Sequence, residues 1–486
     1  MTEQPSGTER GPESDTDVED VSGTRAGDRS SAFALDIEER SIADAFRDWV
    51  SRLRTGDPGA LPSVLGLVIL AIIFDQVSSR FTSQYNIGNI PGQGVYIAVI
   101  GLGLVFVLLL GEIDLSAGTA GGTCAALAAV AVYHGKLHGA VPGLLWWCLV
   151  IGMVIAIGLA VWLRAWSAAV VVAIGWVLVV TNLTQHLFLA LVAAVCIGAA
   201  IGVLNGYLVA KVGIPSFVVT LALFLAWQGV LQFALQGQPI QTANYNLWFN
   251  LTSGNLSVLW SWVFTIVVVG GFIAYTLYTS LSARRRQLAR DGVQLVLLRS
   301  AALAVVAVLV TIFFTQNRGI LISAPRRGIP TPAVIAIVLM ILCTFMLTKT
   351  TWGRHLYATG GNAEAARRAG IDVVHMKVTA FALCSAFGAL GGIMLASSQS
   401  SASLDLGSGN VLLFSVAAAV IGGTSLFGGR GKPRDAIIGA LVIAIIPNGL
   451  SLKPSINPQW QSVITGVVLL LAAAVDAISR RRAARS

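Results

Sequence analysis

Charged residues are scarce in this chain. Asp, Glu, Lys and Arg make up 11% of its 486 residues, whereas hydrophobic residues make up 55%. Soluble proteins usually carry about 25% charged residues, so the composition excludes an ordinary soluble protein. Apolar runs close to bilayer length recur along the chain, among them 61–79, 214–235 and 258–279. The scarcity of charge therefore predicts an all-α, polytopic helical membrane protein.

Residues that build metal sites, disulfides and nucleotide sites are also few. The chain has five cysteines and five histidines, without C-x-x-C or metal-ligand spacing. The segment 422–432 is rich in glycine, but a phosphate loop would need Gly at Leu426 and Ser or Thr at Pro433. We therefore expect no catalytic residue, no metal and no cofactor on this chain. If ATP drives its function, ATP and Mg belong to a separate ATPase chain.

The first 60 residues differ in composition from the rest. Residues 1–45 are acidic, rich in Gly, Ser and Thr, and poor in large apolar side chains, which predicts a disordered tail. Residues 46–60 are expected to form an amphipathic lead-in on the membrane surface. The transmembrane domain is then expected to occupy residues 61–486.

Fourteen apolar segments follow along the transmembrane domain. They begin near residues 61, 95, 117, 143, 167, 187, 214, 258, 297, 331, 376, 408, 435 and 459. The joint at 164–166 is so short that the two helices around it could form a hairpin, merge or re-enter the membrane. The sequence therefore predicts about 12–14 transmembrane helices.

Basic residues divide unequally between alternate loops. With the N-terminus inside, loops and flanks on the inner side hold 21 Lys and Arg residues, against 6 on the outer side. Positive loops stay cytoplasmic, so the split predicts that both termini lie in the cytoplasm. The net charge of +9 is explained in this way, and we expect no nucleic acid partner.

A polar stretch at 352–373 interrupts two apolar runs and falls on the inner side. Residues 364–369 are good helix formers, Gly360 and Gly361 precede them, and Gly370 is expected to end the helix. Such a helix is too polar for lipid and too short to be stable alone in water. It therefore requires a partner surface.

Other candidate residues lie within or between apolar segments. Glu112 and Asp114 could form a gate of a transport pathway, because acidic groups near membrane depth are costly, or they could cap the next helix. Four further pathway candidates are polar or aromatic residues inside helices, and each could equally be a packing residue. They are Phe217, Trp227, Gln228 and Asn448.

An ordered set of motifs resembles the permease subunits of bacterial ABC sugar importers, in the ribose, galactose and xylose branch. These motifs are GEIDLSAG at 111–118, NGYLVA at 205–210, IPSFVVTL at 214–221, RGIPTP at 327–332, GRHLYATGGNAEAAR at 353–367, IGGTSL at 421–426 and NGLS at 448–451. The fourth and fifth motifs are most like xylose-type permeases. The acidic tail is an addition to the family pattern, and region 143–206 looks about two helices longer than usual.

The resemblance implies an ATP-driven importer that moves a monosaccharide, such as the pentose xylose, by alternating access. It implies a permease homodimer in the lipid bilayer of a bacterial plasma (inner) membrane, cytoplasmic ABC ATPase subunits and an extracytoplasmic sugar-binding protein. The loop at about 350–376 would be the ATPase-coupling loop. Its matching positions are Gly361, Asn362, Glu364, Ala365, Ala366 and Gly370.

Two alternatives remain open from the sequence. The chain could be an ion-coupled secondary transporter that uses Glu112 and Asp114 as proton or sodium sites. It could also be a membrane scaffold or receptor that moves no solute.

Overall fold

Apolar helices make up nearly all of the fold. The computed structural model describes residue 47, residues 61–285, 293–319 and 325–453, and scattered positions from 457 to 470. Within that part, nine helices are long and apolar enough to cross a membrane, and four apolar helices are shorter. The nine are α3 (Gln84–Leu109), α5 (Gly143–Trp162), α7 (Leu187–Tyr207), α8 (Ser216–Leu235), α10 (Val258–Arg285), α11 (Val293–Thr315), α12 (Thr331–Lys349), α15 (Val373–Ser398) and α17 (Pro433–Ser451). The four are α2 (Leu61–Val77), α4 (Ala117–Tyr133), α6 (Trp166–Val180) and α16 (Asn410–Gly422). The prediction of a polytopic helical membrane protein is confirmed.

Thirteen of the fourteen predicted apolar segments coincide with these helices. The last segment, near 459, falls mostly outside the described residues, as does the predicted tail at 1–45. Of the predicted lead-in at 46–60, only Arg47 is described. Helix α3 starts at Gln84, well before the predicted residue 95. The prediction missed the first three turns because many of their residues are polar or small and because Pro91 lies within them.

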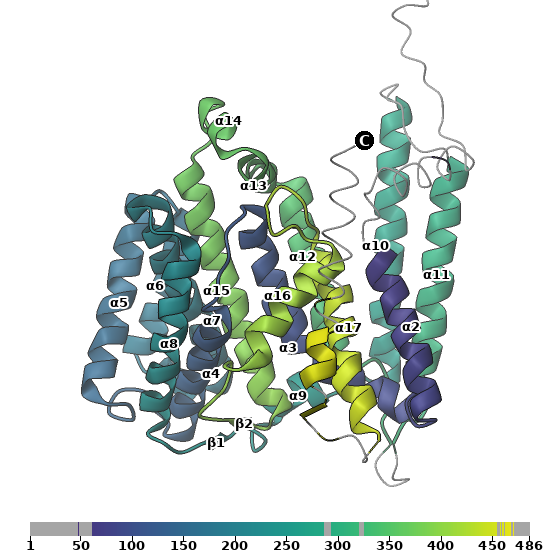
Figure 1. Ribbon diagram of the computed structural model, residues 1–486, viewed down its shortest axis with the longest axis horizontal. Coiled ribbons are helices and arrows are strands. Elements are labelled where there is room, and N and C mark those ends of the chain that lie inside the picture. Colours follow the sequence, from purple (N-terminus) through teal and green to yellow (C-terminus); the bar gives the residue numbers. More distant parts are fainter. Residues whose placement is uncertain are drawn as a thin grey trace, which may run out of the picture.

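The helices run back and forth between two ends of the molecule (Figure 1). One end carries the short helices α13 (Thr351–Gly361) and α14 (Ala363–Arg368), and is named the α14 end. The opposite end, named the α9 end, carries α9 (Asn246–Ser253) and the strands β1 (Ile240–Gln241) and β2 (Ser401–Ala402). The strands pair antiparallel, with Ile240 opposite Ala402.

Helices α3, α4, α7 and α15 form the centre of the bundle, where most of their residues are buried. These helices are rich in Gly and Ala, which let helix backbones approach closely in membrane proteins. A methyl group added at Gly121 of α4 would lie 2.1 Å from the carbonyl oxygen of Gly388 in α15. The packing of these helices therefore depends on small side chains.

Two connections between helices are well defined, and the first was left open by the sequence. Helices α5 and α6 pack against each other and are joined by a tight turn in which Arg164 has φ +57°, so the joint is a hairpin. The uncharged segment 236–257 contains β1 and α9, where Trp248 is fully buried and donates its indole N–H to the carbonyl of Ile393 at 2.9 Å. This segment is therefore ordered against α15.

The five cysteines are free thiols. Four of them are buried, whereas Cys148 is exposed on α5. Among the described residues, no group of three or more His, Cys, Asp or Glu side chains lies together as a metal site would require.

Candidate functional site

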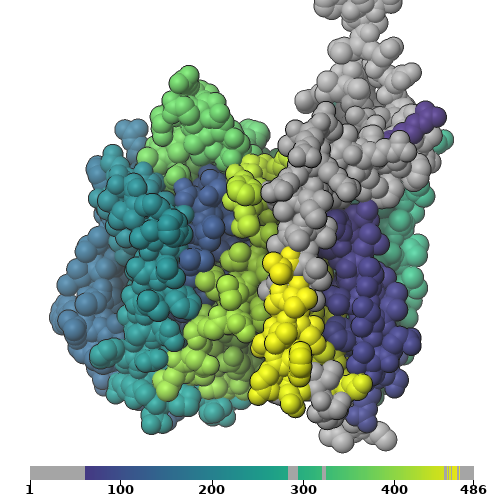
Figure 2. Space-filling model, in the orientation of Figure 1, coloured from purple at the N-terminus to yellow at the C-terminus, as the bar shows by residue number. Residues whose placement is uncertain are grey.

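The polar segment forms two short helices instead of the one that the sequence predicted. Helix α13 begins after Thr350, whose hydroxyl accepts a hydrogen bond from the Gly353 N–H at 3.1 Å. It continues through Gly360 and Gly361, which were expected to precede the helix. Asn362 is extended, with φ −159°, and separates α13 from α14. The α13–α14 unit projects from the α14 end of the molecule (Figures 1 and 2).

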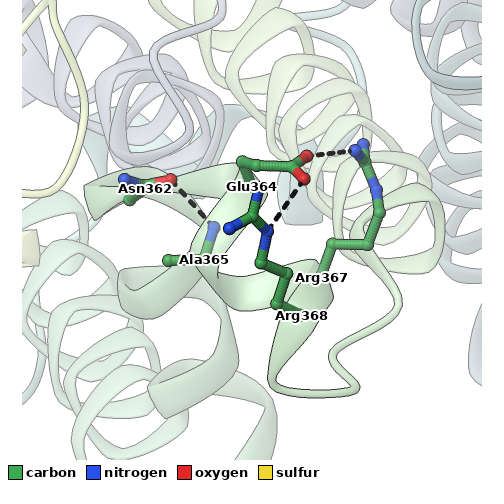
Figure 3. A network of polar contacts seen from close by, with 5 residues as sticks. All are labelled: Asn362, Glu364, Ala365, Arg367 and Arg368. Atoms are coloured by element: carbon green, nitrogen blue, oxygen red, sulfur yellow. Dashed lines mark hydrogen bonds and ion pairs between the residues drawn. The ribbon is translucent and has the colours of Figure 1, made fainter. Parts of the chain in front are cut away.

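Helix α14 is held by its own polar residues (Figure 3). The side-chain oxygen of Asn362 accepts a hydrogen bond from the Ala365 N–H at 2.9 Å and so caps the helix start. Glu364 pairs with Arg367 at 2.7 Å and with Arg368 at 3.3 Å. These three side chains are more than half exposed, so the pairs contribute little to stability and remain open to a partner.

Gly370 ends α14, as the sequence predicted. Its φ of +82° is the left-handed conformation that favours glycine. The Gly370 N–H donates to the Arg367 carbonyl and the Ile371 N–H to the Ala366 carbonyl, each at 3.0 Å. This pair of hydrogen bonds is the Schellman motif, which turns the chain back toward α15.

The predicted coupling residues divide into an exposed and a buried set. Gly361, Asn362, Glu364, Ala365 and Gly370 are exposed. Ala366 is only 4% exposed and faces the body of the protein. A large side chain at Ala366 would therefore disturb the packing of α14, whereas one at Ala365 would only change its outer surface.

The loop that follows α3 and the glycine-rich loop that follows α16 meet beneath α13. The Gly429 N–H donates to the Leu109 carbonyl at 2.8 Å, which links the loop at 423–432 to the end of α3. Gly360 packs so closely on this point that a methyl group there would lie 1.8 Å from the same carbonyl oxygen. The Tyr357 hydroxyl donates to the Gly431 carbonyl at 2.6 Å. The α13–α14 unit is therefore seated on the ends of α3 and α16.

Glu112 lies at the same end, between α3 and α4. Its carboxylate pairs with the Lys377 ammonium of α15 at 2.5 Å, and both side chains are less than a quarter exposed. The pair joins the α3–α4 loop to the first turns of α15, just after α14. The negative charge of Glu112 is therefore neutralised by a lysine of the same chain.

Asp114 is fully buried in the same loop. Its Oδ1 atom accepts hydrogen bonds from the backbone N–H and the hydroxyl of Ser116, at 2.9 and 2.7 Å, while the Ser385 hydroxyl donates to Oδ2 at 3.4 Å. Burial raises the pKa of Asp114, and the hydrogen bonds from Ser116 oppose that rise. Asn205 of α7 donates to the Ser116 hydroxyl at 3.1 Å, so the cluster ties α7 and α15 to this loop.

The other four pathway candidates do not come together. Phe217 is 56% exposed near the start of α8, and Trp227 and Gln228 are half-buried two to three turns further along. Asn448 lies elsewhere, buried in α17, and exchanges hydrogen bonds with the side chain of Asn86 in α3 at 2.8 and 2.9 Å.

A polar cavity at the α9 end was not predicted from the sequence. It encloses about 240 Å³ between the start of α3, α9 and the connection from α11 to α12. Gln93 and Arg318 are among its lining residues. A sign of this cavity in the sequence was the group of polar residues just before the apolar part of α3. Hydropathy alone does not assign these residues to a membrane helix.

Comparison with known proteins places the chain among transport permeases. Residues 165–473 match the family model described as "Branched-chain amino acid transport system / permease component". The xylose transport system permease protein of Haemophilus influenzae is 30% identical over 85% of this chain and 95% of its own length. The ribose import permease protein of Escherichia coli is 26% identical over 85% of this chain and 92% of its own length. No solved structure matches.

The family match covers more than half of the chain, and the two relatives are matched over nearly all of their own length. The bundle of apolar helices and the exposed helix at one end are consistent with a subunit that crosses the membrane and receives a partner. The chain belongs to the family of transport-system permease components.

Proposed function

We propose that the chain is the transmembrane permease subunit of an ATP-driven ABC importer that carries a monosaccharide, a pentose such as xylose, into the cell. The full-length relatives are named for xylose and ribose transport. The family description names branched-chain amino acids instead, but that match begins only at residue 165. The sugar permeases match nearly the whole chain, so we favour a sugar.

One structural observation carries the proposal more than any other. Helix α14 is an exposed polar helix of six residues, capped at both ends and fixed on the ends of the central helices. A partner that pushes on α14 would move α15 through the short connection at 369–372, and α3 through Gly360 and Leu109. This arrangement suits the transfer of a rigid-body motion from an ATPase to the membrane helices.

The proposed mechanism is alternating access. Two cytoplasmic ATPase subunits would bind ATP and Mg and dock on the α14 helices of a permease homodimer. Closure of the ATPases would open the pathway toward an extracytoplasmic sugar-binding protein at the other side. The 21 to 6 split of Lys and Arg supports an orientation with the α14 end and both termini in the cytoplasm and the α9 end outside.

Ala365→Trp tests the docking role of α14. Ala365 is exposed on α14, so the indole would fill the docking surface without changing the packing beneath it. We expect the variant to insert normally and to lose co-purification with the ATPase. The matched control is Ala243→Trp, which places the same side chain at an exposed alanine of the α9 end. ATPase association that is equal in both variants would contradict the docking role.

The ion-coupled alternative is disfavoured by the surroundings of its two candidate carboxylates. Glu112 pairs with Lys377, and Asp114 accepts hydrogen bonds from Ser116 within the loop. The alternative of a membrane scaffold or receptor predicts that the chain binds a partner but moves no solute. Sugar uptake that requires ATP and resists an uncoupler would exclude both alternatives.

A further inference from the structure

The cavity at the α9 end has a polar lining drawn from four parts of the chain. Thirteen residues line it: Tyr85, Gly88, Asn89, Gly92, Gln93, Thr252, Ser253, Gly254, Asn255, Arg318, Arg326, Pro330 and Ser398. Its volume of about 240 Å³ is slightly below the range of about 300–1,000 Å³ usual for drug-sized ligands, so one small solute would fill it.

Arg318 is the most constrained of these side chains. It is only 5% exposed, and its guanidinium lies over the Phe314 ring, 4.9 Å from the ring centre. Its Nη2 group donates to the Gly328 carbonyl at 2.6 Å and to the Asn255 side-chain oxygen at 3.0 Å. A methyl group at Gly88 would lie 2.0 Å from Nη1, so only glycine at this point of α3 leaves room for the guanidinium.

The positive charge of Arg318 is not neutralised within the described part of the chain. Its contacts there are with neutral oxygens, and its buried Nε group has no hydrogen-bond partner. Burial lowers the pKa of Arg318, and the neighbouring charge of Arg326 lowers it further, yet an arginine stays protonated at ordinary pH. The Nε group is too deeply buried to reach a ligand, but Nη1 forms no hydrogen bond with the described residues, so Arg318 can donate from Nη1 to a ligand that brings oxygen acceptors.

Amide side chains complete the polar wall. Asn448 donates to the Gln93 side-chain oxygen at 3.1 Å, which leaves the Gln93 NH₂ group as a donor. Asn448 is itself fixed by its reciprocal hydrogen bonds with Asn86. Arg326 donates to the side-chain oxygen of Asn89, which lies one turn before Gln93 on α3, at 3.5 Å. The donors of the cavity are therefore held in place before any ligand enters.

We infer that this cavity binds the transported monosaccharide at the α9 end, with Arg318 and Gln93 as its principal hydrogen-bond donors. The inference rests on the proposed function and adds a substrate site within a single permease chain. The oxygens of sugar hydroxyls can accept hydrogen bonds from the Nη1 group of Arg318, because Nη2 already donates to Gly328 and Asn255. The Tyr85 ring offers an apolar surface for a sugar ring.

The lining does not suit a branched-chain amino acid. None of the described residues that line the cavity is acidic, so nothing there would neutralise an ammonium group. Among the described residues that line the cavity, Tyr85 and Pro330 are the only large apolar ones, which leaves an isobutyl side chain without an apolar pocket.

Saturation-transfer NMR on the full-length permease in lipid nanodiscs tests the site directly. The probes are D-xylose, D-ribose and L-leucine, each added without a binding protein. The variants are Arg318→Lys, which keeps the charge but removes the Nη1 donor, and Gln93→Leu, which removes the amide. The matched control is Arg327→Lys, because Arg327 is an exposed neighbour that does not line the cavity. Thermal unfolding of each variant checks that it is folded.

We expect saturation transfer from at least one of the two sugars in the wild type and in Arg327→Lys. The apparent affinity should fall about tenfold or more in Arg318→Lys and in Gln93→Leu. Absence of transfer from both sugars in the wild type, unchanged affinity in both cavity variants, or an equally strong signal from L-leucine would overturn the inference. Uptake of sugar by wild-type permease with its ATPase and binding protein, measured separately, shows whether the proposed function holds when the cavity assignment fails.

Discussion

Gly360 and Gly361 are neighbours at the end of α13, but a methyl group added to each would meet different surroundings. At Gly360 it would lie 1.8 Å from the Leu109 carbonyl oxygen and 3.1 Å from the Gly429 nitrogen. At Gly361 it would meet no atom within 4 Å. Gly360→Ala and Gly361→Ala therefore form a matched pair that tests how α13 is seated.

The size of the effect follows from these distances. A Cβ atom essentially never lies within 3.0 Å of a heavy atom to which it is not bonded, and a Cβ added at Gly360 would lie 1.8 Å from the Leu109 carbonyl oxygen. The two groups would therefore have to move apart by at least 1.2 Å (3.0 minus 1.8) in Gly360→Ala. Overpacking of this kind costs about 1–3 kcal/mol, and loss of the Gly429 to Leu109 hydrogen bond adds about 1 kcal/mol. Gly361→Ala should be neutral or stabilising by up to about 1 kcal/mol, because alanine favours helix.

Thermal unfolding of the purified permease in detergent measures the difference, and co-purification of the ATPase reports on docking. We expect a lower melting temperature and weaker ATPase association in Gly360→Ala, and a melting temperature at or above that of the wild type in Gly361→Ala. Equal melting temperatures in the two variants would refute the close seating of α13 on α3.

Three further substitutions test contacts inside the chain by their effect on thermal unfolding. Lys377→Ala should destabilise the protein by about 1–3 kcal/mol because it leaves the partly buried Glu112 unpaired. The double variant with Glu112→Ala should recover part of that loss, and no recovery would argue against a direct pair. Asn448→Leu should cost about 1–3 kcal/mol because it removes a buried hydrogen-bond partner of Asn86. The double variant Asn448→Leu with Asn86→Leu should lose less stability than the sum of the losses in the two single variants. Trp248→Phe should cost about 1–3 kcal/mol by removing a buried hydrogen bond and part of a fully buried ring, and an unchanged melting temperature would contradict this contact.

Apolar patterning was sufficient to predict most of the membrane helices, because a long apolar run has few other stable structures in lipid. It failed at the start of α3, where Asn89 and Gln93 are polar and Pro91 interrupts the pattern. These turns are helical because tertiary packing against α9 and α17 holds them, and such packing leaves no trace in local hydropathy.

The candidate site was predictable where local rules apply. The αL conformation of Gly370 and the cap at Asn362 follow from residue type and position. The burial of Ala366, the extension of α13 through Gly360 and the pairing of Glu112 with Lys377 depend on residues distant in the sequence. Single-sequence reasoning had no access to those contacts.

Sugar uptake into proteoliposomes tests the central claim most directly. The permease would be reconstituted with its ATPase and binding protein, and uptake of D-xylose and D-ribose followed with and without ATP and an uncoupler. We predict uptake that requires ATP hydrolysis, is unaffected by the uncoupler, and is lost in Ala365→Trp. Uptake that collapses with the uncoupler while ATP is held constant, or that proceeds without the ATPase, would contradict an ATP-driven importer coupled through α14.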